Sequence, residues 1–190
     1  PSSYLALFSF TSRITDKCNK MVKSKAVFFD RDGTLNYLID NRAPWDFNEF
    51  RFIKGATEAV KIVKDLGYMV FVVTNQPDVK DGKMAMDTLI EITKHLEMEL
   101  EIDDIMIAYD RDSKLYKPNT GMLEQLIDKY DIDVESSFMI GDRWKDVLAG
   151  NRVNLTTMLL GDYDKCLYTK PDYAFGNILE ACKFIGDKYD

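Results

Sequence analysis

Residues 26–36 read AVFFDRDGTLN: a run of four apolar residues leads directly into Asp30, Arg31 and Asp32 and then into Gly33. A short unbroken apolar run that ends at a turn is typical of a strand buried on both faces, as in a parallel sheet. The two aspartates therefore lie at the carboxyl end of that strand, where open α/β sheets bind their ligands. Because side chains alternate along a strand, both carboxylates can point the same way. Such a pair indicates a site for a hard cation, which binds oxygen ligands and offsets their repulsion.

Length and composition are typical of one globular domain. The chain has 190 residues, of which 46% are hydrophobic and 30% charged, enough for a core of its own. A net charge of -7 and the lack of a basic patch argue against nucleic acid or a membrane surface as a partner. Cys18, Cys166 and Cys182 are widely spaced and form no metal-binding pattern, so we expect a cytoplasmic location. No apolar run is long enough to span a bilayer.

The first residues read as an addition to this domain. The apolar stretch at 4–10 is short for the core of a signal peptide, and no basic segment precedes it. Residues 21–25 lead straight into the first strand and read like a natural start. We therefore predict a flexible N-terminal extension at 1–24 and a single domain at 25–190.

Apolar patterns alternate between strand and helix periods through the rest of the chain. Strands are expected at 26–29, 68–73, 105–108, 138–140 and 155–160, with a short edge strand at 172–174. Helices are expected at 56–66, 83–100, 120–130, 144–151 and 177–185. This alternation predicts a three-layer, doubly wound α/β fold with a mostly parallel sheet between two layers of helices.

The segment 37–54 shows no clear periodicity and is longer than most connections in compact domains. Long ordered loops are often lids or binding loops. Its aromatic residues Trp45, Phe47 and Phe50 could close over a substrate, but we favour the alternative that they pack the loop onto the body of the protein.

Polar side chains occur at or just beyond the carboxyl ends of four predicted strands, which meet at one edge of a parallel sheet. They are Asp30 with Asp32, Thr74, Lys117, and Asp142 with Asp146. The hydroxyl of Thr74 suits a phosphoryl oxygen, and Lys117 suits the charge on a transferring phosphoryl group. Asp142 adds a carboxylate that, with waters and a phosphate oxygen, can complete octahedral Mg²⁺. Asp146 lies one helical turn further on and can orient the ligands or the lysine.

Each of these residues has a simpler explanation when it is taken alone. Thr74 could belong to a turn, Lys117 could be a solvated loop lysine, and Asp142 could cap the following helix. Their joint occurrence, in this order and at these strand ends, favours a functional site.

The order resembles the four motifs of the haloacid dehalogenase (HAD) superfamily of phosphohydrolases. The matching motifs are Asp-x-Asp at 30–32, Thr74, Lys117 and Gly-Asp-x-x-x-Asp at 141–146. The resemblance covers roughly residues 25–185 and looks closest to the heptose-bisphosphate and histidinol-phosphate phosphatase branch. The phrases that carry it are DRDGTLN at 30–36, TNQP at 74–77, KPxxGM at 117–122 and GDR at 141–143. That branch generally has no large cap domain, and the short connections here leave no room for one.

This resemblance implies a Mg²⁺-dependent phosphomonoester hydrolase that works in two steps. Asp30 would attack phosphorus and form an aspartyl-phosphate. Asp32 would protonate the leaving alkoxide and then deprotonate the water that hydrolyses the intermediate. The Asp30 side chain, the Asp32 backbone carbonyl and the Asp142 side chain would hold Mg²⁺. Thr74 and Lys117 would bind the equatorial phosphoryl oxygens.

The implied substrate is a small phosphorylated metabolite, in particular a sugar phosphate such as D-glycero-D-manno-heptose 1,7-bisphosphate. The residues expected to contact it are Asn75, Gln76, Tyr116 and Arg143. Members of this branch commonly carry a zinc loop of Cys and His ligands before the motif lysine. The segment 108–117 has neither residue type, so we expect no zinc.

One position departs from the branch in a way that affects specificity. Tyr116 stands where the branch has an arginine, and a phenol does not replace a planar bidentate cation. The cations left to read a second phosphate or a sugar are Arg42, Arg111, Lys114 and Arg143.

Other functions remain open at this point. The same chemistry could serve histidinol phosphate, another sugar phosphate or a nucleotide. A receiver-like phospho-acceptor also uses clustered acidic residues, a Thr and a Lys, although Asp32 favours turnover over a long-lived phosphoryl group. A catalytically inactive binding scaffold is a further alternative. For each of these functions we expect a monomer or a weak homo-oligomer.

Overall fold

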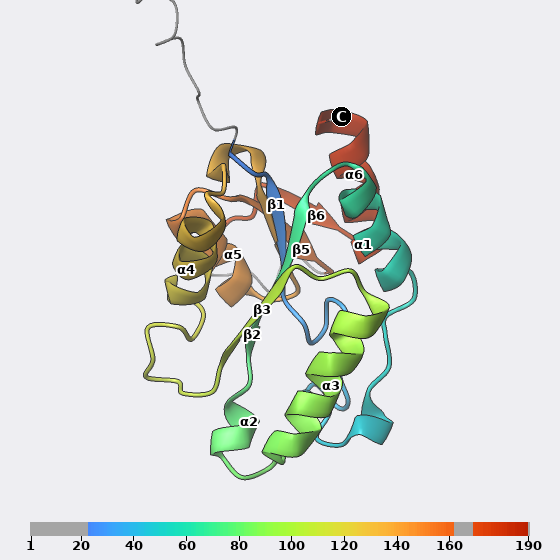
Figure 1. Cartoon of the computed structure of the whole chain (residues 1–190), viewed down its shortest axis with the longest axis vertical. Coiled ribbons are helices and arrows are strands. Elements are labelled where there is room, and N and C mark those ends of the chain that lie inside the picture. The colour runs from blue at the N-terminus through green and yellow to red at the C-terminus, as the bar shows by residue number, and fades with distance from the viewer. Residues whose placement is uncertain (1–22, 162–168, 190) are drawn as a thin grey trace, which may run out of the picture.

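The computed structural model describes residues 23–161 and 169–189. Nearly all of the expected extension at 1–24, with Cys18, and also Cys166 lie outside the described residues. Six parallel strands form one sheet in the order β3-β2-β1-β4-β5-β6 (Figure 1). Their bounds are β1 Ala26–Phe29, β2 Met69–Asn75, β3 Asp104–Ala108, β4 Phe138–Gly141, β5 Thr156–Leu160 and β6 Tyr173–Phe175.

The helices lie on both faces of this sheet. They are α1 Ala56–Asp65, α2 Pro77–Lys80, α3 Met86–Glu99, α4 Gly121–Tyr130, α5 Trp144–Arg152 and α6 Ile178–Tyr189. Two short 3₁₀ helices, η1 Phe47–Glu49 and η2 Val134–Ser136, lie in connections. Helices α1, α3 and α6 cover one face, and α4 and α5 cover the other (Figure 1). The three-layer, doubly wound α/β prediction is confirmed.

Strand β1 shows why this sequence needs two layers of helices. Val27 and Phe29 face the α1, α3 and α6 layer, whereas Ala26 and Phe28 face the α4 layer. All four side chains are completely buried. A strand that is apolar on both sides can lie only in the middle of such a sandwich.

The order of the strands reverses at β1. The chain crosses from β1 to β2 on one side of it and later returns to β4 on the other. Phe29 pairs with both Val72 and Ile140, so Asp30 follows β1 at the carboxyl edge of the sheet, between β2 and β4. This reversal is the place where doubly wound sheets bind ligands.

Three boundaries differ by two residues or more from the sequence-based expectation, and one of them is the end of α6, which lies at Tyr189 and not at 185. Strand β2 continues through Thr74 and Asn75, because both residues pair with the end of β3. The single helix expected at 83–100 is wrong at its start: the short helix α2 comes first, and α3 begins only at Met86. Met84 has the apolar spacing of the helix but lies, buried, in the turn before it.

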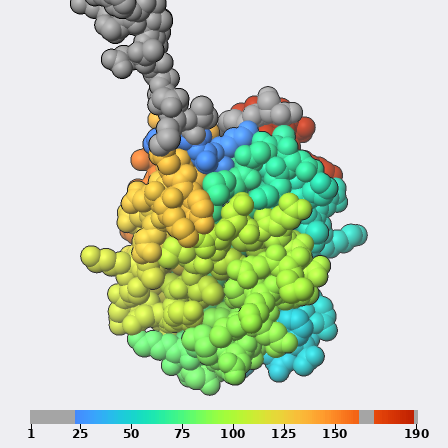
Figure 2. Space-filling view, viewed as in Figure 1, coloured from blue at the N-terminus to red at the C-terminus, as the bar shows by residue number. Residues whose placement is uncertain are grey.

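The connection from β1 to α1 holds η1 as its one helix, and in the part of the chain that the structure describes no large cap covers the sheet edge. The aromatic residues of this connection pack onto the body, with Phe50 buried in the core and Phe47 against it. Helix α3 and the segment that follows it cover the front of the molecule in the space-filling view (Figure 2). Within the described residues, no helix is long and apolar enough to cross a membrane.

Candidate active site

A cavity of about 260 Å³ opens at the carboxyl ends of β1, β2 and β4. The predicted site residues that line it are Asp30, Asp32, Thr74, Asn75, Tyr116, Lys117, Arg143 and Asp146. Gln76 and Asp142 do not line it. Gln76 is buried and its amide donates to Asp32, and the carboxylate of Asp142 belongs to a cluster with Asp30.

Lys117 joins two acidic residues at the base of the cavity. Its ammonium lies 2.7 Å from Oδ1 of Asp30 and 2.6 Å from Oδ1 of Asp146, and it donates to the carbonyl of Val73 at 2.6 Å. The lysine side chain is only 2% exposed. Burial disfavours its charge, but the carboxylates of Asp146 and Asp30 outweigh burial and raise the pKa of Lys117. The lysine is therefore a fixed positive charge at this point.

Asp30 lies in an acidic and nearly dry environment. Burial raises the pKa of Asp30 strongly; the Lys117 ammonium opposes this rise, and the carboxylates of Asp146 and Asp142 add to it. Burial, with the carboxylate of Asp146, also raises the pKa of Asp142. The site thus concentrates more negative charge than its one buried lysine offsets.

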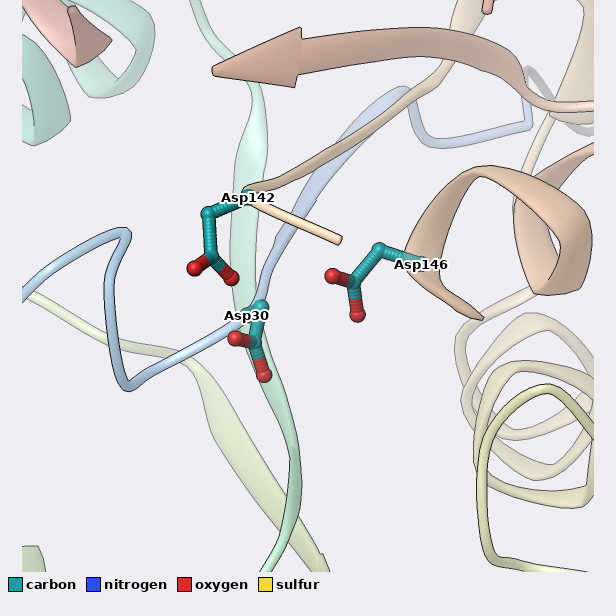
Figure 3. Close-up of side chains that lie close together, drawn as sticks. All are labelled: Asp30, Asp142 and Asp146. Carbon is teal, nitrogen blue, oxygen red and sulfur yellow. The ribbon is translucent and has the colours of Figure 1, made fainter. Parts of the chain in front are cut away.

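Three carboxylates converge here from three elements (Figure 3). Asp30 follows β1, Asp142 follows β4, and Asp146 comes from the first turn of α5; one ligand atom from each lies within 4.8 Å of the others. Oδ1 of Asp142 is buried and has no hydrogen-bond partner within the described residues. An unpartnered buried oxygen among carboxylates fits a hard divalent cation such as Mg²⁺. The donor set therefore suits the metal that the sequence predicts.

Gly33 allows the turn after β1 to approach this cluster. Its φ is +87°, and a Cβ atom added to it would lie 2.3 Å from Oδ2 of Asp142. Any other residue would be strained in its backbone and would also displace the carboxylate.

The carboxylate of Asp32 is held by a network of donors. Nε and Nη2 of Arg31 donate to it at 2.9–3.2 Å, Asn36 donates at 2.9 Å, and Gln76 donates at 2.5 Å. Gln76 also donates to the hydroxyl of Thr74 at 2.9 Å. Gln76 thus positions two neighbours, whereas the sequence predicts that it contacts substrate.

Sequence reasoning gave no role to Arg31. Its side chain is 1% exposed and forms a bidentate pair with Asp32, the adjacent residue. An arginine in a turn is usually expected to be exposed to solvent, so only the structure shows that this one is buried beside a carboxylate of the site. No sequence pattern marks it.

Asn75 fastens the loop that carries Lys117. Its amide donates to the carbonyl of Lys117 at 2.9 Å and accepts from the backbone N–H of Lys117 at 2.9 Å. Tyr116, half-buried, precedes that lysine in the cavity wall.

The rim of the cavity comes from the β1–α1 connection, from α2 and from the start of α5. Arg42 donates to both oxygens of Glu49 at 2.8 Å and stacks on Trp45, whose indole donates to Asp78 at 2.8 Å. Trp45 thus packs this loop against α2.

The sequence offered four cations that could bind a second phosphate or the sugar of the substrate. Of these, Arg42 and Arg143 line the cavity, whereas Arg111 and Lys114 do not. Arg111 is paired with both oxygens of Asp81 at 2.8 Å. A further cation on the rim, Lys145, was missed. Burial and the charge of Arg143 lower the pKa of Lys145.

Comparison with known proteins supports the same family. The HAD-hydrolase-like family model matches residues 115–181. A D-glycero-beta-D-manno-heptose-1,7-bisphosphate 7-phosphatase of Pasteurella multocida is 35% identical over 150 residues, which are 72% of this chain and 80% of that protein. The Haemophilus ducreyi enzyme of the same name is 32% identical over 180 residues, covering 85% of this chain and 98% of its own.

A solved structure shows the same fold. The D,D-heptose 1,7-bisphosphate phosphatase of B. bronchiseptica, complexed with magnesium and phosphate, superposes with a TM-score of 0.77 at 21% identity. The match covers 86% of this chain and 99% of that one. With relatives of 35% and 32% identity over most of both sequences, the chain belongs to the haloacid dehalogenase-like family of phosphatases.

Proposed function

We propose that this phosphatase hydrolyses a small sugar phosphate, such as D-glycero-D-manno-heptose 1,7-bisphosphate, with Mg²⁺ and through an aspartyl-phosphate on Asp30. The observation that carries this proposal is the position of Asp30, which lines the cavity, contacts the Lys117 ammonium and belongs to the carboxylate cluster. The names of the relatives support the choice of sugar phosphate.

Asp30 is the nucleophile in this proposal. Among the described residues, a hydrogen bond reaches only Oδ1 of its carboxylate, from Lys117. Oδ2 is therefore the oxygen that forms the bond to phosphorus, while the bond from phosphorus to the leaving alkoxide breaks. Lys117 and the hydroxyl of Thr74 stabilise the equatorial oxygens, where charge is spread in the transition state.

Asp32 moves the protons. It donates a proton to the leaving alkoxide in the first step. In the second step it takes a proton from the water that attacks phosphorus, and Asp30 is released with inorganic phosphate. Arg31, Asn36 and Gln76 keep its carboxylate in place for both steps.

Asp30 and Asp142, with the backbone carbonyl of Asp32, would hold Mg²⁺, and Asp146 would hold Lys117. The bound ion would neutralise charge on the phosphoryl group. The cluster offers only oxygen ligands, which favours Mg²⁺ over zinc. We further propose that the enzyme works in the cytoplasm as a monomer or weak homo-oligomer, in keeping with its acidic charge and scattered cysteines.

Phosphate release tests the activity. Wild type with Mg²⁺ is assayed on heptose 1,7-bisphosphate, histidinol phosphate and common sugar phosphates, with Asp30→Asn as the blank. Turnover of a sugar phosphate that is lost in the variant supports the proposal. If turnover persists in Asp30→Asn, Asp30 is not the nucleophile. If wild type hydrolyses none of these esters, the proposed phosphatase activity is contradicted.

Thermal denaturation tests the metal site without relying on activity. Mg²⁺ bound to the folded state raises Tm as its concentration exceeds Kd. This rise should be present in wild type and in Asp112→Asn, which removes an exposed carboxylate outside the cluster. It should be lost in Asp142→Asn. An equal rise in all three proteins would show that the ion binds elsewhere.

A further inference from the structure

Lys145 is a cation in the cavity wall that the proposed chemistry does not use. Its side chain is half-buried and lines the same cavity as Asp30. Its ammonium lies 5.3 Å from the ring centre of Tyr116 and 5.8 Å from that of Trp144. Within residues 23–161 and 169–189 it forms no ion pair with a carboxylate. The lysine is thus held beside aromatic rings without a direct carboxylate partner.

The other cations of the cavity are engaged with carboxylates to different degrees. Lys117 is buried between two aspartates, and Arg42 forms a bidentate pair with a glutamate. Arg143, two residues before Lys145, is more loosely held, with its Nε 3.7 Å from a carboxylate oxygen of Asp142. The positive charges of the cavity that are least engaged with carboxylates therefore lie at the start of α5.

We propose that Lys145, with Arg143 beside it, forms a second anion subsite that makes the enzyme prefer substrates with a second anionic group. This inference rests on the proposed function. While the scissile phosphoryl group lies against Asp30, a second phosphate or a carboxylate on the same small molecule would lie against Lys145. A substrate with an amine there, such as histidinol phosphate, would be repelled.

The physical reason is the partial desolvation of this ammonium. A charge taken out of water without a partner is costly, and an anion on the substrate would remove that cost. The faces of Tyr116 and Trp144 attract the cation and limit its motion. An ammonium has three donors, so contacts with the rings leave donors for the substrate. The bound anion would thus contact an ammonium that is already held in place and partly desolvated.

The test compares substrates that differ only in the second anion. Steady-state kinetics with Mg²⁺ are measured on heptose 1,7-bisphosphate and on the two heptose monophosphates, for wild type, Lys145→Gln and Lys145→Arg. A phosphorylated sugar acid is a further arm, which distinguishes a carboxylate from a phosphate as the second anion. Lys114→Gln is the matched control, since it removes the same charge from an exposed lysine that does not line the cavity.

Wild type should prefer the bisphosphate to the monophosphates in kcat/KM. In Lys145→Gln that preference should fall about tenfold, the usual effect of losing one charge-assisted hydrogen bond, and the loss should appear mainly in KM. Lys145→Arg and Lys114→Gln should keep the preference.

Two results would overturn the inference in different ways. If Lys145→Gln changes kcat/KM equally for the bisphosphate and the monophosphates, or changes it for none of them, Lys145 does not bind a second anion. The phosphatase proposal would then still stand. If wild type releases no phosphate from any ester, the proposed function fails and this inference fails with it.

Discussion

The ammonium of Lys117 lies 2.7 Å from Oδ1 of Asp30, although the two residues are 87 positions apart in the sequence. The parallel sheet creates this contact, because Asp30 follows β1 and the loop of Lys117 follows β3. Both side chains are almost completely removed from solvent. The charge of each residue in the folded state therefore depends on the presence of the other.

Replacing Lys117 with methionine should reduce both stability and activity. It would leave Asp30 and Asp146 buried without their cation, which typically costs about 3–5 kcal/mol in the free energy of unfolding. The kcat should fall by about two to three orders of magnitude, because a positioned charge on the phosphoryl oxygens is lost. Urea denaturation and phosphate release measure the two effects.

A double variant provides the control for that prediction. Adding Asp30→Asn to Lys117→Met removes one of the stranded charges, so the double variant should be more stable than Lys117→Met alone. Stabilities that simply add would show that the two residues do not interact.

Replacing Arg31 with lysine should lower kcat more than it changes KM. A lysine keeps the charge but cannot donate from two nitrogens, as Nε and Nη2 of Arg31 do, to both oxygens of Asp32. The proton-transferring carboxylate would then be less well oriented, and we expect kcat to fall about tenfold to a hundredfold. Arg51→Lys is the matched control, since Arg51 is exposed and, among the residues that the structure describes, its side chain donates only to the neighbouring carbonyl of Phe50. A kcat that changes equally in both variants would contradict the role of Arg31.

The sequence was sufficient to predict the sheet and the residues at its edge. The unbroken apolar runs at β1 and β4 can bury both of their faces only in a parallel sheet that lies between two layers of helices. Such sheets bring the carboxyl ends of their strands together. Asp30, Thr74, Lys117 and Asp146 therefore line one cavity, as their order along the chain predicts.

What the sequence could not predict depends on contacts between distant segments. Apolar spacing at Met84 looks helical, but the residue is buried in a turn. Gln76 and Arg31 read as solvent-facing or substrate-facing polar residues until the fold buries them against Asp32. Lys145 looks like any surface lysine at the start of a helix, because only the tertiary structure shows that it lines the cavity.

The pair of Arg42 and Glu49 should give the protein a stability that depends on acid pH. Hydrogen bonds from Arg42, followed by one from the backbone of Trp45, lower the pKa of Glu49 from 4.5 to about 2. Because this pKa is lower in the folded state, the stabilisation is complete above the unfolded value and is lost as pH falls toward 2. Wild type should exceed Glu49→Gln in Tm near neutral pH, and the difference should shrink below pH 4.5. Arg42→Gln should lose the same pH-dependent part of the stability. A Tm difference between wild type and Glu49→Gln that stays constant across pH would contradict the pairing.

Gly33 and Gly67 offer a matched pair of substitutions for testing the approach of the turn to Asp142. Both have a positive φ, +87° and +79°, but only at Gly33 would a Cβ meet another atom, while nothing lies within 4 Å at Gly67. Gly67→Ala should therefore cost only the left-handed backbone strain, about 1–2 kcal/mol, and should leave kcat unchanged.

Gly33→Ala should show the same strain and, in addition, lose the function of the carboxylate cluster. Its Cβ would lie 2.3 Å from Oδ2 of Asp142, so the carboxylate would have to move away from Asp30. The Mg²⁺-dependent rise in Tm should then be reduced together with kcat, whereas Gly67→Ala keeps both. Denaturation with and without Mg²⁺ separates strain, which both variants share, from loss of the site, which only one shows. If both variants keep the Mg²⁺ response and turnover, the close approach at residue 33 is not required for the site.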